Sequence, residues 1–216
     1  MPPGRPRRLP AGARPPFSWI GGATCLDFLN TVSWRAPGVL ENERLRGPED
    51  LADWAVAARL LPESRAFDER SITLAHELRQ GLHDLMLRAA HDEPPSDDAV
   101  DWLNRWIREC RGHLRFTRPN RDAGWQWVGD DAPRDVDPGL ALLGLVVESA
   151  VELLRSPDLV LLRACANERC GWLFLDRSRK HNRRWCEMRE CGGRAKARRY
   201  QSRRRAASAR EPVSDA

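Results

Sequence analysis

The 216-residue sequence lacks a hydrophobic run long enough to cross a membrane. Its longest apolar stretch covers residues 140–147, whereas a membrane-spanning helix needs about 20 apolar residues. The N-terminal stretch MPPGRPRRLPAGARPPF also lacks the apolar segment of a signal peptide and is rich in proline, glycine and arginine. We therefore expect a cytoplasmic protein without membrane association, in which residues 1–16 form a disordered arm.

Recognisable catalytic signatures are also missing. His76-Glu77 begins like the H-E-x-x-H motif of zinc hydrolases, but Gln80 stands where the second histidine is required. The chain contains no G-x-S-x-G nucleophile motif and no glycine-rich phosphate-binding loop. We therefore expect a protein that is not an enzyme.

Lysine is almost absent, since Lys180 and Lys196 are the two lysines of the chain, and arginine supplies nearly all the positive charge. Residues 17–162 carry 16 basic and 25 acidic side chains, whereas residues 163–210 carry 16 basic and 4 acidic ones. Codon bias can explain many arginines, but it does not explain why acids become scarce near the C-terminus. An acidic body joined to a basic tail favours a polyanionic partner for the tail.

The cysteines carry the sharpest chemical signal. Cys165 and Cys170, then Cys186 and Cys191, form two C-x4-C pairs separated by fifteen residues. Cysteine pairs repeated after a spacer of about 12–20 residues are typical of a tetrahedral zinc site. An iron–sulfur cluster and disulfides are weaker alternatives, and a reducing cytoplasm disfavours disulfides. We expect one structural Zn2+, with His181 in the spacer as a loop residue.

The residues around the cysteines predict a treble-clef-like zinc finger. Trp172 to Leu175 reads as one strand, residues 183–185 as a second, and a helix is expected to start at Cys191. A module of about 40 residues cannot bury enough apolar surface by itself. Zinc should therefore supply much of its folding free energy, and replacing Cys186 is expected to unfold the module while the helical body stays folded.

The helix expected after Cys191 is basic nearly all round and has no apolar stripe. Such a helix packs poorly against its own protein, and its arginines can contact phosphate oxygens or guanine edges. The expected nucleic-acid-binding residues are Arg183, Arg184, Arg194, Lys196, Arg198, Arg199 and Arg203.

The sequence as a whole predicts a mainly α (α+β) fold. A helical domain is expected over residues 17–157 and the zinc finger with its basic helix over residues 158–207, followed by a disordered tail at 208–216. Short alternating runs at 113–117 and 125–128 predict a small β-hairpin in the helical domain. The first three expected helices cover Cys25 to Ser33, Pro48 to Pro62 and Asp68 to Ala90, with a loop at 35–47 between the first and the second. A fourth helix is capped by Ser96 and is expected to bury Val100, Leu103, Trp106 and Ile107. The last is a long apolar helix from Asp137-Pro138 to Leu153.

Several polar residues surround the otherwise apolar first helix. Two interpretations of them stay open: they line a pocket for a small-molecule effector, or they form a buried polar network that ties the loop to the helix. These residues are Asp27, Asn30, Thr31, Arg35 and Arg44.

The segment LRACANERCGWLFLDRSRKHNRRWCEMRECGGRAKARRY closely resembles the CGNR zinc-finger family. CLDFLNTVSWR, the ERL at residues 43–45 and the L-x-x-W at residues 51–54 resemble the ABATE domain. The resemblance implies a bacterial transcription regulator whose zinc domain, with the same four cysteines as ligands, binds DNA. One departure is that Gly193 replaces the asparagine of the CGNR motif.

The role of the helical domain and the kind of nucleic acid stay open at this stage. The helical domain would sense a small molecule or form a homodimer, since a two-fold assembly suits a DNA binder. The main alternative is an RNA-binding or ribosome-associated zinc protein, because arginine-rich tails also bind RNA. An adaptor that uses the finger for protein contacts is a further alternative.

Overall fold

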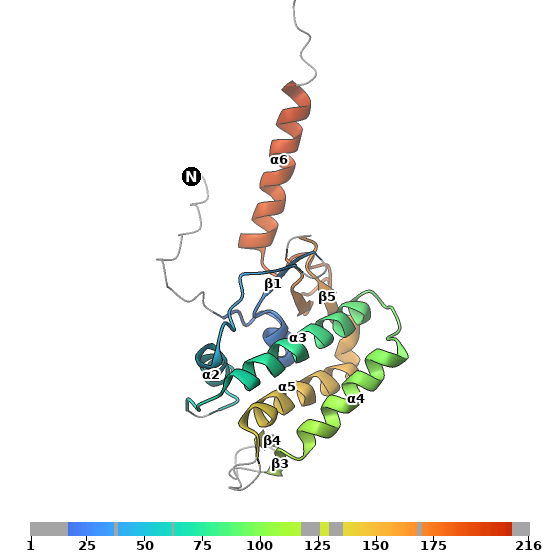
Figure 1. Cartoon of the computed structure of the whole chain (residues 1–216). Helices are drawn as coiled ribbons and strands as arrows, with labels where there is room; N and C mark the ends of the chain where they lie inside the picture. The colour runs from blue at the N-terminus through green and yellow to red at the C-terminus, as the bar shows by residue number, and fades with distance from the viewer. Residues whose placement is uncertain are drawn as a thin grey trace, which may run out of the picture.

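The computed structural model describes residues 17–36, 39–61, 63–117, 126–129, 136–167 and 170–208, and the expected N-terminal arm and most of the expected C-terminal tail lie outside these ranges. Over these described ranges the architecture is mainly helical with three two-stranded sheets, which confirms the predicted fold class (Figure 1). No described helix combines the length and apolar character that a membrane span requires. In chain order the elements are α1 (Thr24–Leu29), β1 (Ser33–Ala36), β2 (Val39–Glu41), α2 (Pro48–Ala57), α3 (Glu69–Ala90), α4 (Asp97–Arg111), β3 (Leu114–Thr117), β4 (Gln126–Gly129), α5 (Pro138–Arg155), the 3-10 turn η1 (Pro157–Leu161), β5 (Leu162–Ala164), β6 (Leu173–Leu175), the π-turn η2 (Met188–Gly192) and α6 (Gly193–Ser208).

Helix α5 is the central helix of the body, as its long apolar sequence predicts. Its start is fixed by Pro138 in the first turn and by Asp137, whose carboxylate accepts from the backbone N–H groups of Gly139 and Leu140. The helix packs against α1, α3 and α4, and most of its first ten residues are buried. Ser149 near its C-terminal end accepts a hydrogen bond from the backbone of Cys25, which joins α5 to α1.

Helix α3 begins next to the predicted start at Asp68, and α4 begins at the predicted cap, Ser96. Asp68 accepts from the backbone of Ser71, and Ser96 accepts from the backbone of Ala99. The expected buried stripe of α4 is partly wrong, because Val100 is 41% exposed. Trp106 is buried as predicted, Leu103 and Ile107 are half-buried against the core, and Cys110 extends the buried stripe toward the end of the helix.

The prediction for the first helix and the loop after it is wrong in two respects. Helix α1 ends at Leu29 and does not extend to Ser33, and the backbone N–H of Thr31 donates to the carbonyl three residues back, at Phe28, in a tighter turn. Within the expected loop, β1 and β2 pair as an antiparallel hairpin. The second helix likewise ends at Ala57, before the expected proline.

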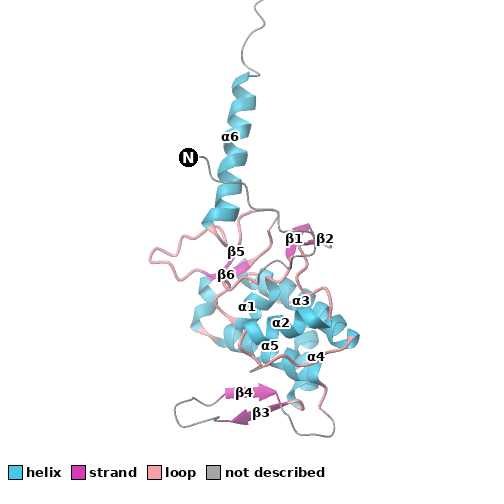
Figure 2. Ribbon diagram, turned by 90° about the vertical axis from the view of Figure 1, so that its left-hand side faces the viewer, coloured by secondary structure: helices cyan, strands magenta, loops and turns pink. Residues whose placement is uncertain are grey.

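The β3–β4 hairpin confirms the alternating pattern in the sequence. The two strands pair in antiparallel register from Leu114 with Gly129 to Thr117 with Gln126. The hairpin and helix α6 lie at opposite ends of the molecule (Figures 1 and 2).

The C-terminal end of the fold differs from the expected finger. The partner of β6 is β5, and residues 183–185 form no strand in this described segment. Leu162, Leu173 and Leu175 of this hairpin belong to the same hydrophobic core as α1, α3 and α5. Helix α6 then projects away from the body (Figures 1 and 2). The finger is therefore joined to the body by a shared core, whereas its basic helix stands apart.

Candidate metal centre and nucleic-acid interface

The first cysteine pair lies in the turn between β5 and β6. Cys165 follows β5, and its backbone N–H donates to the carbonyl of Trp172 at 2.8 Å. Cys170 precedes β6, and its N–H donates to the carbonyl of Asn167 at 2.7 Å. Gly171 adopts φ +71°, a left-handed conformation that most other residues adopt only at a cost, so this turn needs the glycine.

The second cysteine pair is formed by Cys186 and by Cys191 in the π-turn η2. The turn is closed by a hydrogen bond from the backbone of Gly192 to Glu187. A Cβ at position 192 would lie 2.4 Å from the Met188 sulfur, so the exposed Met188 side chain would have to move to make room for it.

The buried carboxylate of Asp176 holds the chain between the two pairs. It accepts from the backbone N–H groups of Ser178 at 3.0 Å and Arg183 at 2.7 Å. Burial acts to raise the pKa of Asp176, but these hydrogen bonds outweigh it and hold the pKa below its ordinary value. Asp176 is therefore charged at neutral pH and fixes the path of the chain toward Cys186.

The four predicted cysteines meet in one buried cluster. Their Sγ atoms all lie within 4.8 Å of one another, and Cys186 Sγ is 3.6 Å from Cys170 Sγ and 3.5 Å from Cys191 Sγ. Disulfide bonds require about 2.05 Å, so the cysteines are free. Zinc–sulfur bonds of about 2.3 Å place tetrahedral ligands about 3.8 Å apart, which fits these separations. Four thiols without a competing oxygen ligand are suited to a soft or borderline cation.

The surroundings of the cluster favour thiolates that share a cation. The backbone N–H of Cys186 donates to Cys165 Sγ at 3.4 Å. The hydrogen bond from the Cys170 thiol lowers the pKa of Cys165, whereas the hydrogen bond with Cys165 raises the pKa of Cys186. Four thiolates this close together would repel one another, and a bound cation would neutralise them. The N-terminus of α6, which begins two residues after Cys191, adds a favourable positive dipole.

The helical body binds the finger through buried hydrogen bonds. The side-chain amide of Asn30 both donates to and accepts from the backbone of Leu173, at 2.9 and 3.0 Å, and so pairs the second edge of β6. The Trp172 indole donates to the carbonyl of Val32 at 2.8 Å. His83 on α3 contacts the carbonyl of Gly171 at 2.9 Å. These bonds connect residues distant in sequence.

The residues predicted to line an effector pocket lie at this junction. Asn30 holds β6 as described, and the Thr31 hydroxyl accepts from the buried guanidinium of Arg79. Arg44 donates to the carbonyl of Asn30, and its guanidinium lies 4.9 Å from the centre of the Trp172 ring. Asp27 accepts from the backbone of Gly21. Arg35 has a side chain outside the described part of the structure.

Partial burial of Asp27 leads to a pH-dependent prediction. Burial raises its pKa from 3.8 to about 6, so the folded protein binds the proton more tightly than the unfolded chain. The ionised Asp27 carboxylate therefore destabilises the folded protein, and this effect is absent well below pH 4 and grows as pH rises through 6. Asp27→Asn should therefore stabilise the protein at pH 7.5 by roughly 1–2 kcal/mol, allowing for partial exposure. Its advantage should be smaller at pH 5 when urea unfolding is compared at both values.

Asp101→Asn, on the exposed side of α4, is the matched control for this substitution. It removes the same charge from a site open to water, so its effect should not grow between pH 5 and pH 7.5. An Asp27→Asn effect of equal size at both pH values would contradict the role of burial.

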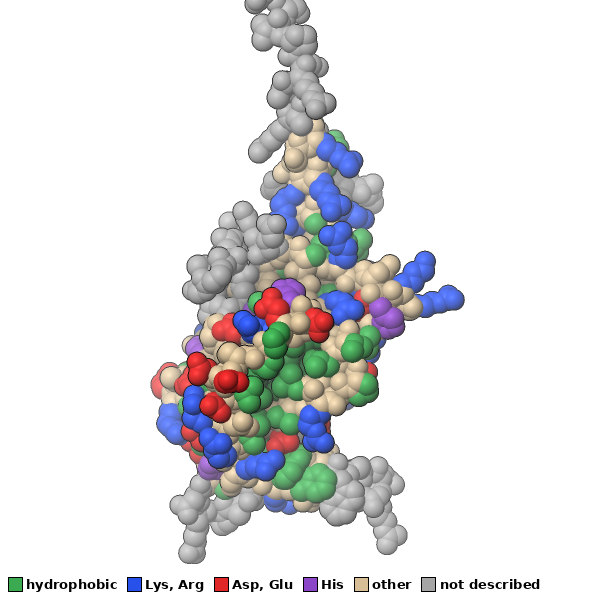
Figure 3. All heavy atoms as spheres, turned by 90° about the vertical axis from the view of Figure 1, so that its right-hand side faces the viewer, with side chains coloured by type: hydrophobic (Ala, Val, Ile, Leu, Met, Phe, Trp, Pro, Cys, Tyr) green, Lys and Arg blue, Asp and Glu red, His purple; other side chains and the backbone are tan. Residues whose placement is uncertain are grey.

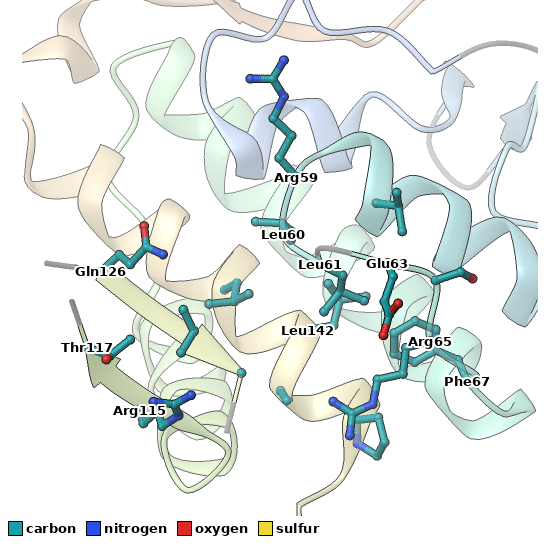
Figure 4. Close-up of a pocket in the computed structure, with 17 residues that line it drawn as sticks. Arg59, Leu60, Leu61, Glu63, Arg65, Phe67, Arg115, Thr117, Gln126 and Leu142 are labelled. Atoms are coloured by element: carbon teal, nitrogen blue, oxygen red, sulfur yellow. The ribbon is translucent and has the colours of Figure 1, made fainter. Parts of the chain in front are cut away.

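A separate cavity of about 1050 Å3 lies between the α2–α3 connection, the β3–β4 hairpin and the start of α5 (Figure 4). Leu60, Leu61 and Leu142 supply apolar lining, and Arg65 and Arg115 supply guanidinium groups. Asp27, Asn30, Thr31 and Arg44 are not among its lining residues.

Most of the predicted nucleic-acid-binding residues are exposed on α6. Arg194, Lys196, Arg199 and Arg203 have exposed side chains. Figure 3 shows Lys and Arg side chains along this helix and most of the visible acidic side chains on the body.

Arg183 and Arg184, the predicted nucleic-acid-binding residues that precede α6, both make contacts within the finger. Arg183 donates to the carbonyls of Trp185 and Cys186 and lies 4.2 Å from the centre of the Phe174 ring. It therefore fixes the second cysteine turn. Arg184 is exposed, with its guanidinium 5.2 Å from the centre of the Trp185 ring.

Arg198 on α6 is also exposed, and its guanidinium donates to the side-chain oxygen of Asn167. Arg179 and Lys180, in the stretch between β6 and Cys186, are further exposed basic residues that the sequence prediction does not include. Their position in the run SRKHNRR between the cysteine pairs is the sequence signal that could have identified them.

Comparison with known families supports both halves of this description. The ABATE profile, described as "Putative stress-induced transcription regulator", matches residues 22–157. The chain belongs to the ABATE family. The CGNR zinc-finger profile matches residues 162–204 of this ABATE protein, which include the four clustered cysteines. No protein with a curated description matches the chain significantly.

The departure from the CGNR motif lies at the start of α6. Gly193 has ordinary helical angles, and a Cβ there would lie 3.8 Å from the nearest atom found, the carbonyl oxygen of Met188. The local fold of this ABATE protein would therefore accept the family's asparagine without a clash.

Proposed function

We propose that this ABATE protein is a zinc-dependent transcription regulator that binds double-stranded DNA through α6. The exposed basic helix carries the proposal. Helix α6 has 16 residues, lacks an apolar face and projects from the body, so intramolecular packing does not explain its sequence (Figure 1). Phosphate contacts would neutralise its charge, and the family description agrees with a regulatory role.

The shape of α6 favours duplex DNA over duplex RNA. A helix about 10–12 Å wide fits the major groove of B-DNA, which is about 12 Å wide. The major groove of A-form RNA is deep and narrow and excludes such an element. Sixteen residues span about 24 Å, and arginines around the helix could reach both groove walls.

We propose zinc as the resident metal, held by Cys165, Cys170, Cys186 and Cys191. A closed site of four thiolates suits structural zinc, and such a site leaves no open position for catalysis. We accordingly propose that the protein binds its partner without catalysing a reaction. Bound zinc would hold the two cysteine turns together at the base of α6.

Fluorescence anisotropy with labelled duplex DNA, duplex RNA and single-stranded RNA at matched salt tests the partner. We expect tighter binding to duplex DNA and a steep inverse dependence of affinity on salt. Tighter binding to RNA would replace this proposal by the RNA-binding alternative. Absence of binding to every nucleic acid in dilute buffer would reject both, and elemental analysis of the same sample identifies the metal.

For the helical body we propose a ligand-sensing role, supported by the cavity beside α5. Its volume lies near the upper end of the range of small-molecule sites, about 300–1,000 Å3. Helix α5 lines the cavity at its first turns and leads through η1 to β5 and Cys165. The competing role for the helical body is to form the homodimer that the sequence analysis also allows. The molecular mass of the protein in solution tests it.

A further inference from the structure

Asn167 links the cysteine cluster to the basic helix. It lies in the first cysteine turn and is 2% exposed. Its side-chain Nδ2 donates to Cys191 Sγ at 3.3 Å, and its Oδ1 accepts from Nη2 of Arg198 at 2.6 Å. One buried amide therefore spans from a metal ligand to the second turn of α6.

The chemistry of the two neighbours calls for a side chain that both donates and accepts a hydrogen bond at this position. A cysteine thiolate accepts hydrogen bonds, whereas a guanidinium can only donate them. The residue between them must therefore offer a donor on one side and an acceptor on the other. Asparagine does both at the required length, and these neighbours also fix which side of the amide carries the nitrogen. Aspartate would keep the acceptor and lose the donor, and alanine would lose both.

Helix α6 needs such a link because its own surface offers little else for packing. It has no apolar stripe, and within the described chain it packs mainly against η2, which directly precedes it. A helix joined to its support at one end can pivot or fray. The bond from Arg198 to Asn167 adds a second point of attachment one turn further along.

We propose that Asn167 is a positioning residue that couples the metal centre to the direction of α6, and that Arg198 docks the helix and does not contact nucleic acid. This inference rests on the proposed function in one respect, namely that the direction of α6 matters for DNA binding. A bound metal would fix the Cys191 sulfur, which holds the Asn167 amide, and the amide orients Arg198.

A double-mutant cycle in the full-length, zinc-loaded protein tests the role of Arg198. We expect Asn167→Ala and Arg198→Ala each to weaken duplex-DNA binding about tenfold, and the double variant to be no weaker than either single one. Losses that multiply in the double variant would overturn the docking role. Arg199→Ala is the matched control, and its loss should multiply with that of Asn167→Ala.

Two measurements without nucleic acid separate this link from the proposed function. Asn167→Asp should lower zinc affinity roughly 10–100-fold in chelator competition, because it loses the donor to Cys191. Arg198→Ala should leave zinc affinity unchanged and lower the 15N order parameters of the α6 backbone, because it loses the docking bond. Zinc affinity and helix order at wild-type values in Asn167→Ala would overturn the inference, even if DNA binding were never observed.

Discussion

Replacing Cys186 by serine is expected to release the metal and to unfold the helical body together with the finger. Metal binding stabilises small four-ligand fingers by about 10–16 kcal/mol, which is comparable to the total stability of a typical domain. Leu173 and Leu175 of β6 lie in the main hydrophobic core, and Asn30 and Trp172 bond across the junction. If the cysteine turns open, these contacts are lost and buried backbone groups lose their partners.

This expectation differs from the one drawn from sequence alone, in which the body stays folded. Thermal unfolding followed by far-UV circular dichroism, with and without a strong chelator, distinguishes them. One cooperative transition, shifted to a much lower temperature in Cys186→Ser, would support the shared core. A body transition that keeps its midpoint would show that the finger and the body are separate units.

Cys110→Ser provides the matched control for this experiment. Cys110 is a buried cysteine of α4, and burial raises its pKa to about 12, so it stays protonated at neutral pH. The substitution should cost about 1–2 kcal/mol for burying a hydroxyl group and should leave the metal content unchanged. Loss of metal from Cys110→Ser would show that metal loss in Cys186→Ser is not specific to the cluster.

Local features of the fold could be predicted from the sequence because nearby residues determine them. Asp68, Ser96 and Asp137 each cap a helix through hydrogen bonds within two or three residues. The cysteine cluster could be predicted from spacing alone, because each pair closes its own short turn.

Contacts between distant segments could not be predicted. Asn30 and Leu173 are 143 residues apart, and no local pattern indicates that a side-chain amide pairs with the edge of a strand. The pairing of β6 with β5, in place of the expected strand at 183–185, also lies at the junction between the body and the finger. Chain composition also cannot separate arginines that bind carbonyls, such as Arg183, from those that face solvent.

Replacing Arg194, Arg199 and Arg203 together by alanine is expected to weaken duplex-DNA binding roughly 100-fold at about 0.1 M salt. These side chains are exposed on α6. Arg198 is exposed as well, but it donates to Asn167, and Arg183 donates to backbone carbonyls. If each arginine neutralises one phosphate, the slope of log affinity against log salt should become shallower by about 3. Alanine favours the helix, so the fold and the metal content should persist.

The control for this prediction removes the same number of arginines from the other end of the molecule. Arg105, Arg108 and Arg111 are exposed on α4, which lies in the helical body away from α6 (Figure 1). Their replacement lowers the net charge equally, so any loss from long-range attraction alone appears in both variants. A loss confined to the α6 variant identifies contact by that helix. Equal losses would mean that net charge, and not α6, governs binding.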